Sequence, residues 1–274
     1  MYQEFYGFRE KPFHVTADPS FLYPSRHHQE AMAHLLYGIR QRLGFLMITG
    51  EVGTGKTTLA KALLQRLEGP TRTALILNPV LSGTELLRAI ARDFGIFPAP
   101  EGGSGTRGPY SRGEILRALE GFLLKNAESG GTAVLVIDEA QTLSASTLEQ
   151  VRLLSNVETV KEKLLQIVLI GQPELAQRLA NESRLRALAG RIAVRYEVQP
   201  LDEKEVGEYI EHRLRKVSNG RGPVFTPGAV RGIARASGGF PRRVNLLCDQ
   251  ALVAGYVRET MEITEELVEM KTLS

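Results

Sequence analysis

Hydrophobic and polar positions along the chain follow two periods that alternate with each other. Mostly apolar runs, typical of strands buried on both faces of a sheet, lie at 45–49, 73–78, 133–137 and 164–172. Apolar residues at helical spacing lie at 59–67, 83–96 and 114–128. A last run, at 191–198, alternates apolar and polar residues. Because strands and helices follow each other in turn, the pattern predicts an α/β fold with a parallel sheet flanked by helices.

The strand signals stop near residue 201. The segments that follow have helical spacing and lie at 205–217, 226–237, 241–257 and 264–270. A break rich in proline and glycine, at 98–113, interrupts the first part of the chain. We therefore expect two domains, an α/β core at 1–200 and a small all-helical domain at 201–274.

Composition changes this picture little. The 274 residues are 43% hydrophobic and 24% charged, which is typical of a folded protein. The net charge of +3 and a pI near 9.0 permit nucleic acid or anionic membranes as partners without requiring them. No run of eighteen apolar residues occurs, and the first residues lack a signal peptide's basic head, so we expect a cytoplasmic protein without a membrane span. The single cysteine, Cys248, is expected to be a buried thiol.

Two adjacent carboxylates, Asp138 and Glu139, follow the apolar run at 133–137. An unpaired carboxylate at the end of a buried strand would cost several kcal/mol or stay protonated. The sequence therefore predicts a positively charged partner at this strand end.

A glycine-rich segment supplies that partner. Gly50, Gly55, Lys56 and Thr57 satisfy the spacing Gly-x-x-x-x-Gly-Lys-Ser/Thr, directly after an apolar run and before a helical one. Backbone amides in such a turn, at the start of a helix, bind polyphosphate, and the lysine reaches the β- and γ-phosphates. The predicted ATP-binding residues are Gly50, Glu51, Val52, Gly53, Thr54, Gly55, Lys56, Thr57 and Thr58.

The two carboxylates then take separate roles. Thr57 and Asp138 are predicted to hold Mg²⁺, and Glu139 is predicted to act as general base on the attacking water. A kinase must keep water out, whereas a placed carboxylate admits it, so the pair favours ATP hydrolysis. Because parallel strands end at one edge of their sheet, Gln172 is expected at the same edge as the carboxylates.

Together these motifs resemble those of AAA+ ATPases. Within that class the chain is most similar to the ExeA/GspA-type ATPases of the general secretion pathway and their relatives in exopolysaccharide and protein-sorting loci. The resemblance covers about residues 5–258 and rests on FYGFREKPF, ADPSFLY, HHQEAMAHLLYGI, TGEVGTGKTTL, VLVIDEAQTL, LIGQPEL, GRIAVRYEVQPL and GGFPRRVNLLC. It implies a P-loop core with a helical lid. Several members continue into a membrane span and a peptidoglycan-binding domain, and those activities are not carried over to this chain.

The resemblance also assigns catalytic roles. It places Gln172 at the sensor-one position, where many AAA+ proteins have Asn, Ser or Thr, and Arg242 of GGFPRR at the sensor-two position over the phosphates. It implies a homo-oligomer, in which an arginine before the last core strand reaches the neighbouring subunit's γ-phosphate. Arg191 is preferred for this role over Arg184 and Arg186. The aromatic start, 8–13 and 23–28, either packs near the adenine or belongs to the core.

The resemblance favours an oligomeric ATPase that assists assembly or regulation of a bacterial envelope secretion system, with a secretion protein as partner. A DNA-associated ATPase of the transposition-helper or loader type is the alternative, because residues 212–258 carry nine Arg or Lys and one acid, Asp249. A solvated basic face explains the same stretch. A slow nucleotide switch is the third hypothesis.

Overall fold

The computed structural model describes residues 2–77, 79–98, 110–158, 162–218, 220 and 222–269. The chain forms two compact units. The sheet unit consists of residues 30–50 and 60–197, and the helical unit consists of the described residues of 1–29, 51–59 and 198–274. Residues 2–29 thus pack with the C-terminal helices. The division into domains at residue 200 stays a prediction.

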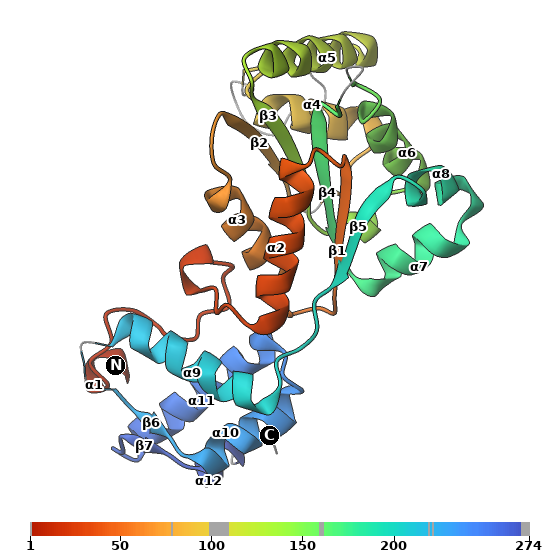
Figure 1. Cartoon of the computed structure of the whole chain (residues 1–274). Helices are drawn as coiled ribbons and strands as arrows, with labels where there is room; N and C mark the ends of the chain where they lie inside the picture. Colours follow the sequence, from red (N-terminus) through yellow and green to blue (C-terminus); the bar gives the residue numbers. More distant parts are fainter. Residues whose placement is uncertain are drawn as a thin grey trace. The chain divides into compact units, whose positions relative to one another are not determined.

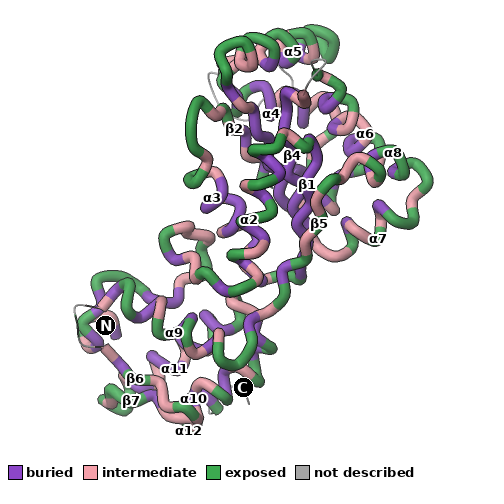
Figure 2. Tube along the Cα trace, viewed as in Figure 1, coloured by how far each residue is buried: buried purple, intermediate pink, exposed green. Residues whose placement is uncertain are grey.

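The sheet unit is built on five parallel strands in the order β2-β3-β4-β1-β5 (Figure 1). The strands are β1 (Phe45–Thr49), β2 (Thr71–Ile76), β3 (Thr132–Ile137), β4 (Leu165–Gly171) and β5 (Ile192–Glu197). Every residue of β1 and β4 is buried, as their continuous apolar runs predict, whereas β5 alternates between half-buried and exposed positions (Figure 2). The predicted α/β fold with a parallel, helix-flanked sheet is confirmed.

One helix, α2, precedes these strands, and the others connect them. They are α2 (Arg26–Arg40), α3 (Lys56–Arg66), α4 (Gly83–Asp93), α5 (Arg112–Glu128), η2 (Ala140–Thr142), α6 (Ala145–Leu154), α7 (Pro173–Asn181), η3 (Ser183–Leu185) and α8 (Arg186–Ala189). α2 and α3 each contribute residues to both units. In α4, Ser82 and Glu85 form a capping box, because each side chain bonds the other residue's backbone amide. A second capping box, of Ser111 and Glu114, starts α5 after the Pro/Gly-rich break. Residues 99–109 of that break lie outside the described residues.

The helical unit has its own hydrophobic core. Its elements are α1 (Tyr2–Phe5), η1 (Pro19–Phe21), α9 (Glu203–Val217), β6 (Val224–Phe225), α10 (Pro227–Ser237), α11 (Pro241–Val257), β7 (Glu262–Ile263) and α12 (Glu265–Glu269). Phe8 and Phe13 are buried in this core, as the core alternative for the aromatic start requires. Cys248 is fully buried there, which confirms the expected buried thiol, and burial raises its pKa.

The sequence predicted an all-helical C-terminal segment, but the structure also contains two short strands there. β6 and β7 pair in parallel and form a second, two-stranded sheet. Each strand has two residues, which is too short to show a period of two in the sequence. Among the described residues, no helix is long and apolar enough to cross a membrane.

Arg213 belongs to the core of the helical unit and not to a solvated basic face. Its guanidinium donates to the carbonyl oxygens of Pro12 at 2.6 Å and His14 at 3.0 Å, and to the Tyr209 hydroxyl at 3.1 Å. The same group lies 4.6 Å from the centre of the Phe21 ring. A buried guanidinium is stable only when its donors are satisfied. Arg213 therefore ties the N-terminal segment to α9.

Candidate active site

The glycine-rich loop that follows β1 uses backbone conformations that side chains disfavour. Gly53 and Gly55 have φ angles of 88° and 93°. α3 begins at Lys56, and the Leu59 amide donates to the Gly55 carbonyl at 2.9 Å. The amides before Leu59 thus form the first turn of a helix, which is the part of a helix that attracts anions.

Lys56 lies against this loop. Its ammonium donates to the Glu51 carbonyl oxygen at 2.8 Å, and the residue is only 5% exposed. With Thr57 in the first turn of α3, the loop offers an ammonium, a hydroxyl and a glycine-shaped backbone turn, a donor set that fits a Mg²⁺-polyphosphate. The individual roles of residues 50–58 stay predictions.

His28 supports the loop from α2, a contact that the sequence did not reveal. His28 is 5% exposed, its Nε2 lies 2.9 Å from the Thr54 carbonyl oxygen, and its Nδ1 lies 2.7 Å from the Ser25 hydroxyl. Because a carbonyl only accepts, Nε2 carries the proton, and in the neutral ring Nδ1 accepts from Ser25. A Cβ on Gly55 would lie 2.9 Å from Nε2. A side chain at residue 55 would therefore collide with the His28 ring in its present position.

We expect the buried His28 to make the protein less stable in acid. Burial lowers the pKa of His28 below its ordinary value of 6.5. Below that pH the unfolded chain binds a proton that the folded chain does not, so the free energy of unfolding falls as the pH falls. A His28→Gln variant stays neutral and can still donate to Thr54. Melting temperatures at about pH 7.5 and about pH 5.5 should therefore differ less in the variant than in the unmodified protein.

His212, whose pKa burial also lowers, is present in both proteins, so its contribution cancels in this comparison. Glu205 and His27 act weakly on His28 in opposite directions and are likewise unchanged. An equal loss of melting temperature in the two proteins would remove His28 as a source of acid sensitivity.

The GGFPRR segment contacts the same loop within the helical unit. The Arg242 amide donates to the Gly53 carbonyl at 3.3 Å, and a Cβ on Gly53 would lie 3.0 Å from the Arg242 Cβ. Gly239 has a φ of 76°, and a Cβ there would lie 1.9 Å from the Leu201 carbonyl oxygen. Gly239 is therefore required where α11 begins. The structure brings the backbone of Arg242 beside the glycine-rich loop, and a role for its exposed side chain stays a prediction.

The two carboxylates lie where β3 ends, as predicted. The Asp138 amide continues the ladder to the Ile76 carbonyl at 2.9 Å, and Asp138 is 2% exposed. Its Oδ1 accepts from the Glu139 amide at 2.9 Å. Glu139 adopts left-handed backbone angles (φ 54°, ψ 35°), which few residues other than glycine do and which cost free energy. The chain therefore turns sharply after Asp138.

Gln172 meets Glu139, as the topology predicted. Gln172 Nε2 donates to Glu139 Oε2 at 3.3 Å. A second amide, from Gln141 of the DEAQ segment, donates to the same oxygen at 2.6 Å. Gln141 belongs to the motif VLVIDEAQTL, but its role could not be predicted, because periodicity does not show that η2 turns this side chain back toward Glu139.

Arg191 has partners in its own chain. Its Nη1 donates to the Ser155 hydroxyl at 2.9 Å and to Asn156 Oδ1 at 2.6 Å, both just after α6. Arg184 and Arg186 are exposed. The structure therefore gives Arg191 a bond to the end of α6, and its predicted action on a neighbouring subunit stays a prediction.

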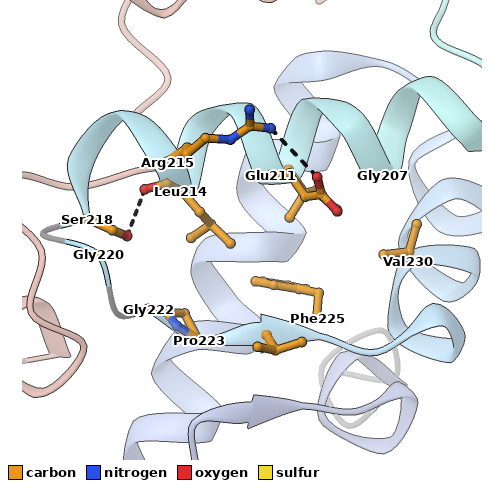
Figure 3. A pocket seen from close by; sticks show the side chains of 12 residues that line it. Gly207, Glu211, Leu214, Arg215, Ser218, Gly220, Gly222, Pro223, Phe225 and Val230 are labelled. Carbon is orange, nitrogen blue, oxygen red and sulfur yellow. Dashed lines mark hydrogen bonds and ion pairs between the residues drawn. The ribbon is translucent and has the colours of Figure 1, made fainter.

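A cavity of about 470 Å³ lies between α9 and β6 in the helical unit (Figure 3). Leu214, Phe225 and Val230 point into it, and an ion pair between Glu211 and Arg215, at 3.7 Å, spans its rim. None of the predicted site residues lines it. The cavity is mostly apolar, and among its described lining residues one acid, Glu211, balances one base, Arg215, so this lining does not have the character of a phosphate site.

Comparison with known proteins identifies the family. Residues 39–179, just over half of the chain, match the family model of the AAA domain. General secretion pathway protein A of Aeromonas hydrophila is 45% identical over 267 residues, which are 96% of this chain and 46% of that protein. The predicted resemblance to the general secretion pathway ATPases is confirmed, although the chain spans only about half of that relative's length.

Solved structures agree on the fold. The Aeropyrum pernix ORC1 protein in complex with DNA has a TM-score of 0.70 at 18% identity, covering 97% of this chain and 69% of that one. Drosophila ORC bound to DNA has a TM-score of 0.68 at 21% identity, covering 97% of this chain and 65% of that one. At such identities the likeness concerns the fold alone. On the match of its family model, this chain belongs to the AAA domain family and is an ATPase.

Proposed function

We propose that this protein is an oligomeric ATPase that assists the assembly or regulation of a bacterial envelope secretion system. The observation that carries the proposal is the 45% identity to general secretion pathway protein A across 96% of the chain. A secretion protein is the proposed partner, and the cytoplasm is the proposed location. The relative's remaining length falls outside this comparison, so its whole activity is not transferred.

We assign the steps of hydrolysis to the chain's own residues. The loop at 50–58 binds the phosphates through its backbone amides, and Lys56 neutralises charge on them. Mg²⁺, held by Thr57 and Asp138, would neutralise the remaining phosphate charge. Glu139 removes a proton from the attacking water. Gln172 orients that water or reads the γ-phosphate, and Arg242 acts as the sensor from the helical unit.

A DNA-associated ATPase remains the second candidate because of the basic stretch at 212–258, but the structure uses several of those charges internally. Arg213 is buried, and Arg235 and Arg258 pair with Glu265 and Glu266 at 2.7 and 3.0 Å. Arg215 pairs with Glu211. Arg221 lies outside the described residues. This pairing leaves fewer cations for phosphate contacts, which supports the secretion hypothesis over the DNA hypothesis.

We expect duplex DNA to bind only weakly at physiological salt, with a dissociation constant of about 10⁻⁶ to 10⁻⁴ M, the range of non-specific binding. Fluorescence anisotropy across a salt titration measures this affinity. Lys216→Glu tests the exposed part of the stretch, and Lys125→Glu on α5 makes the same change of charge elsewhere. Tight binding that Lys216→Glu abolishes and Lys125→Glu preserves would favour the DNA hypothesis. Neighbouring genes offer an independent check, since secretion genes and transposase genes support opposite hypotheses.

A further inference from the structure

Gln141 bridges the ends of two neighbouring strands in the sheet unit. Its Nε2 donates to Glu139 Oε2 at 2.6 Å, and its Oε1 accepts from the Gln172 backbone amide at 3.1 Å. One side-chain amide thus uses both of its polar ends, one on the second residue after β3 and the other on the first residue after β4. The position of the Glu139 carboxylate is thereby set relative to the end of β4.

The surroundings of Gln141 hold it in this geometry. A Cβ on Gly171 would lie 2.8 Å from Gln141 Oε1, so the approach of the amide to β4 requires glycine at that position. The Gln141 carbonyl oxygen accepts from Arg178 Nη1 at 2.8 Å. Arg178 on α7 is itself held by Glu182, the residue after α7, at 2.6 Å. The bridge is therefore fixed at its backbone, at its side chain and by the shape of the neighbouring strand.

The two amides that reach Glu139 donate to the same oxygen. Gln141 Nε2 and Gln172 Nε2 both bond Oε2, and within the part of the chain that the structure describes no hydrogen bond reaches Oε1. An oxygen that already accepts two N–H groups is a poorer proton acceptor than its unbonded partner. The network therefore makes the two carboxylate oxygens chemically different.

We propose that Gln141 is a positioning residue that turns Glu139 so that Oε1 accepts the proton of the attacking water. The inference rests on the proposed role of Glu139 as general base. In this step the water O–H bond breaks, its proton goes to Oε1, and its oxygen forms the bond to the γ-phosphorus of ATP as the bond to ADP breaks. Gln141 is assigned no contact with the reacting atoms, and it acts through the orientation of Glu139.

Gln141→Leu tests this role because leucine removes both polar ends at similar volume. We expect kcat to fall about 10- to 100-fold, the usual loss when a hydrogen bond to a charged group is removed. KM for ATP should change less than about twofold, because Gln141 is assigned no part in the binding of ATP in the ground state. Gln177→Leu, an exposed position on α7, makes the same chemical change elsewhere and should retain full turnover.

The melting temperature separates positioning from mere folding support, because loss of a positioning residue lowers kcat in a protein that melts as before. A second variant, Gln141→Glu, keeps the size of the side chain and its Oε1 acceptor but cannot donate to Glu139 Oε2. Its kcat should therefore fall at least as far as that of Gln141→Leu, with KM for ATP again nearly unchanged.

Either of two results would overturn the inference. One is a Gln141→Leu protein with the turnover of Gln177→Leu, and the other is a loss of turnover accompanied by a lower melting temperature. Should Gln141→Leu fail to fold, the turnover of Gln141→Glu decides alone. A Glu139→Gln protein is measured in parallel. If it keeps normal turnover, the proposed general base has failed, whereas an inactive Glu139→Gln beside a normal Gln141→Leu rejects the inference on Gln141 alone.

Discussion

Replacing Glu139 by Gln is expected to lower ATP turnover by roughly two to four orders of magnitude, the usual contribution of a general base. Nucleotide affinity should change little, because the amide keeps the shape of the side chain. The bond that Glu139 accepts from Gln172 Nε2 does not involve the residues that are predicted to bind ATP. Phosphate release measures turnover, and a fluorescent nucleotide measures affinity. A Glu139→Gln protein with near-normal turnover would exclude Glu139 as the base.

Lys56→Ala is the contrasting variant and should lose ATP binding itself. The ammonium contributes positive charge for the phosphates and closes the loop through its bond to Glu51 at 2.8 Å. Its removal therefore affects both the charge and the shape of the loop. Lys125→Ala, on the exposed face of α5, controls for the loss of one positive charge. If Lys56→Ala binds ATP as tightly as Lys125→Ala, the assignment of the loop is wrong.

Loss of Arg191 is expected to reduce turnover by about 10³- to 10⁵-fold while sparing ATP binding. An arginine supplied by a neighbouring subunit stabilises charge on the transferring phosphoryl group, and this is the size of its usual effect. If Arg191 serves only to bond Ser155 and Asn156 after α6, the variant should have a lower melting temperature and retain its turnover. Turnover and thermal unfolding of Arg191→Ala, measured together, distinguish the two roles.

Three further arginines serve as comparisons. Arg195 lies on β5, the strand that directly follows Arg191, and donates to the Ala189 carbonyl at 2.7 Å, so Arg195→Ala is a matched control for a lost own-chain bond. Arg184→Ala and Arg186→Ala test the other two candidates for the neighbouring-subunit role. A loss of turnover confined to one of those two would move the assignment to it.

Mixing inactive Arg191→Ala with inactive Glu139→Gln protein tests action across an interface. An interface that takes Glu139 from the first protein and Arg191 from the second has both groups intact, so turnover should partly return. Sedimentation in the presence of a non-hydrolysable ATP analogue establishes whether the two variants assemble together. If they do so and no ratio restores turnover, Arg191 does not act on a neighbouring subunit.

The strands were predictable because a continuous or alternating series of apolar residues is visible in the sequence of each strand. The apolar runs became β1, β2, β3 and β4, and the alternating run became the half-exposed strand β5. The elements that the sequence patterns missed include short ones, such as α6, α7, β6 and β7, and also the 15-residue helix α2. Their stability comes from contacts with neighbouring elements, and a local pattern does not record such contacts.

The site residues show the same difference between features that are local in the sequence and contacts that form on folding. The glycine-rich loop and the carboxylates after β3 are local in sequence, and so they could be found by spacing. His28 beside Thr54 and the amide of Gln141 on Glu139 could not be found in this way. Both are polar residues without a distinctive spacing in the sequence. Their contacts depend on the direction in which a turn points each side chain and on which groups lie beside it after folding.

The sequence by itself determined the class of this protein, because phosphate binding and a buried parallel sheet each demand particular residues at fixed local spacing. Only the tertiary structure decided how those residues are supported. In the sequence Arg213 is one member of a basic stretch, whereas in the structure it is buried and bonds the N-terminal segment. Gly171 and Gly239 proved to be places where a Cβ would collide with distant atoms. Such roles depend on burial and on contacts between residues far apart in the chain, which are fixed only when the chain has folded.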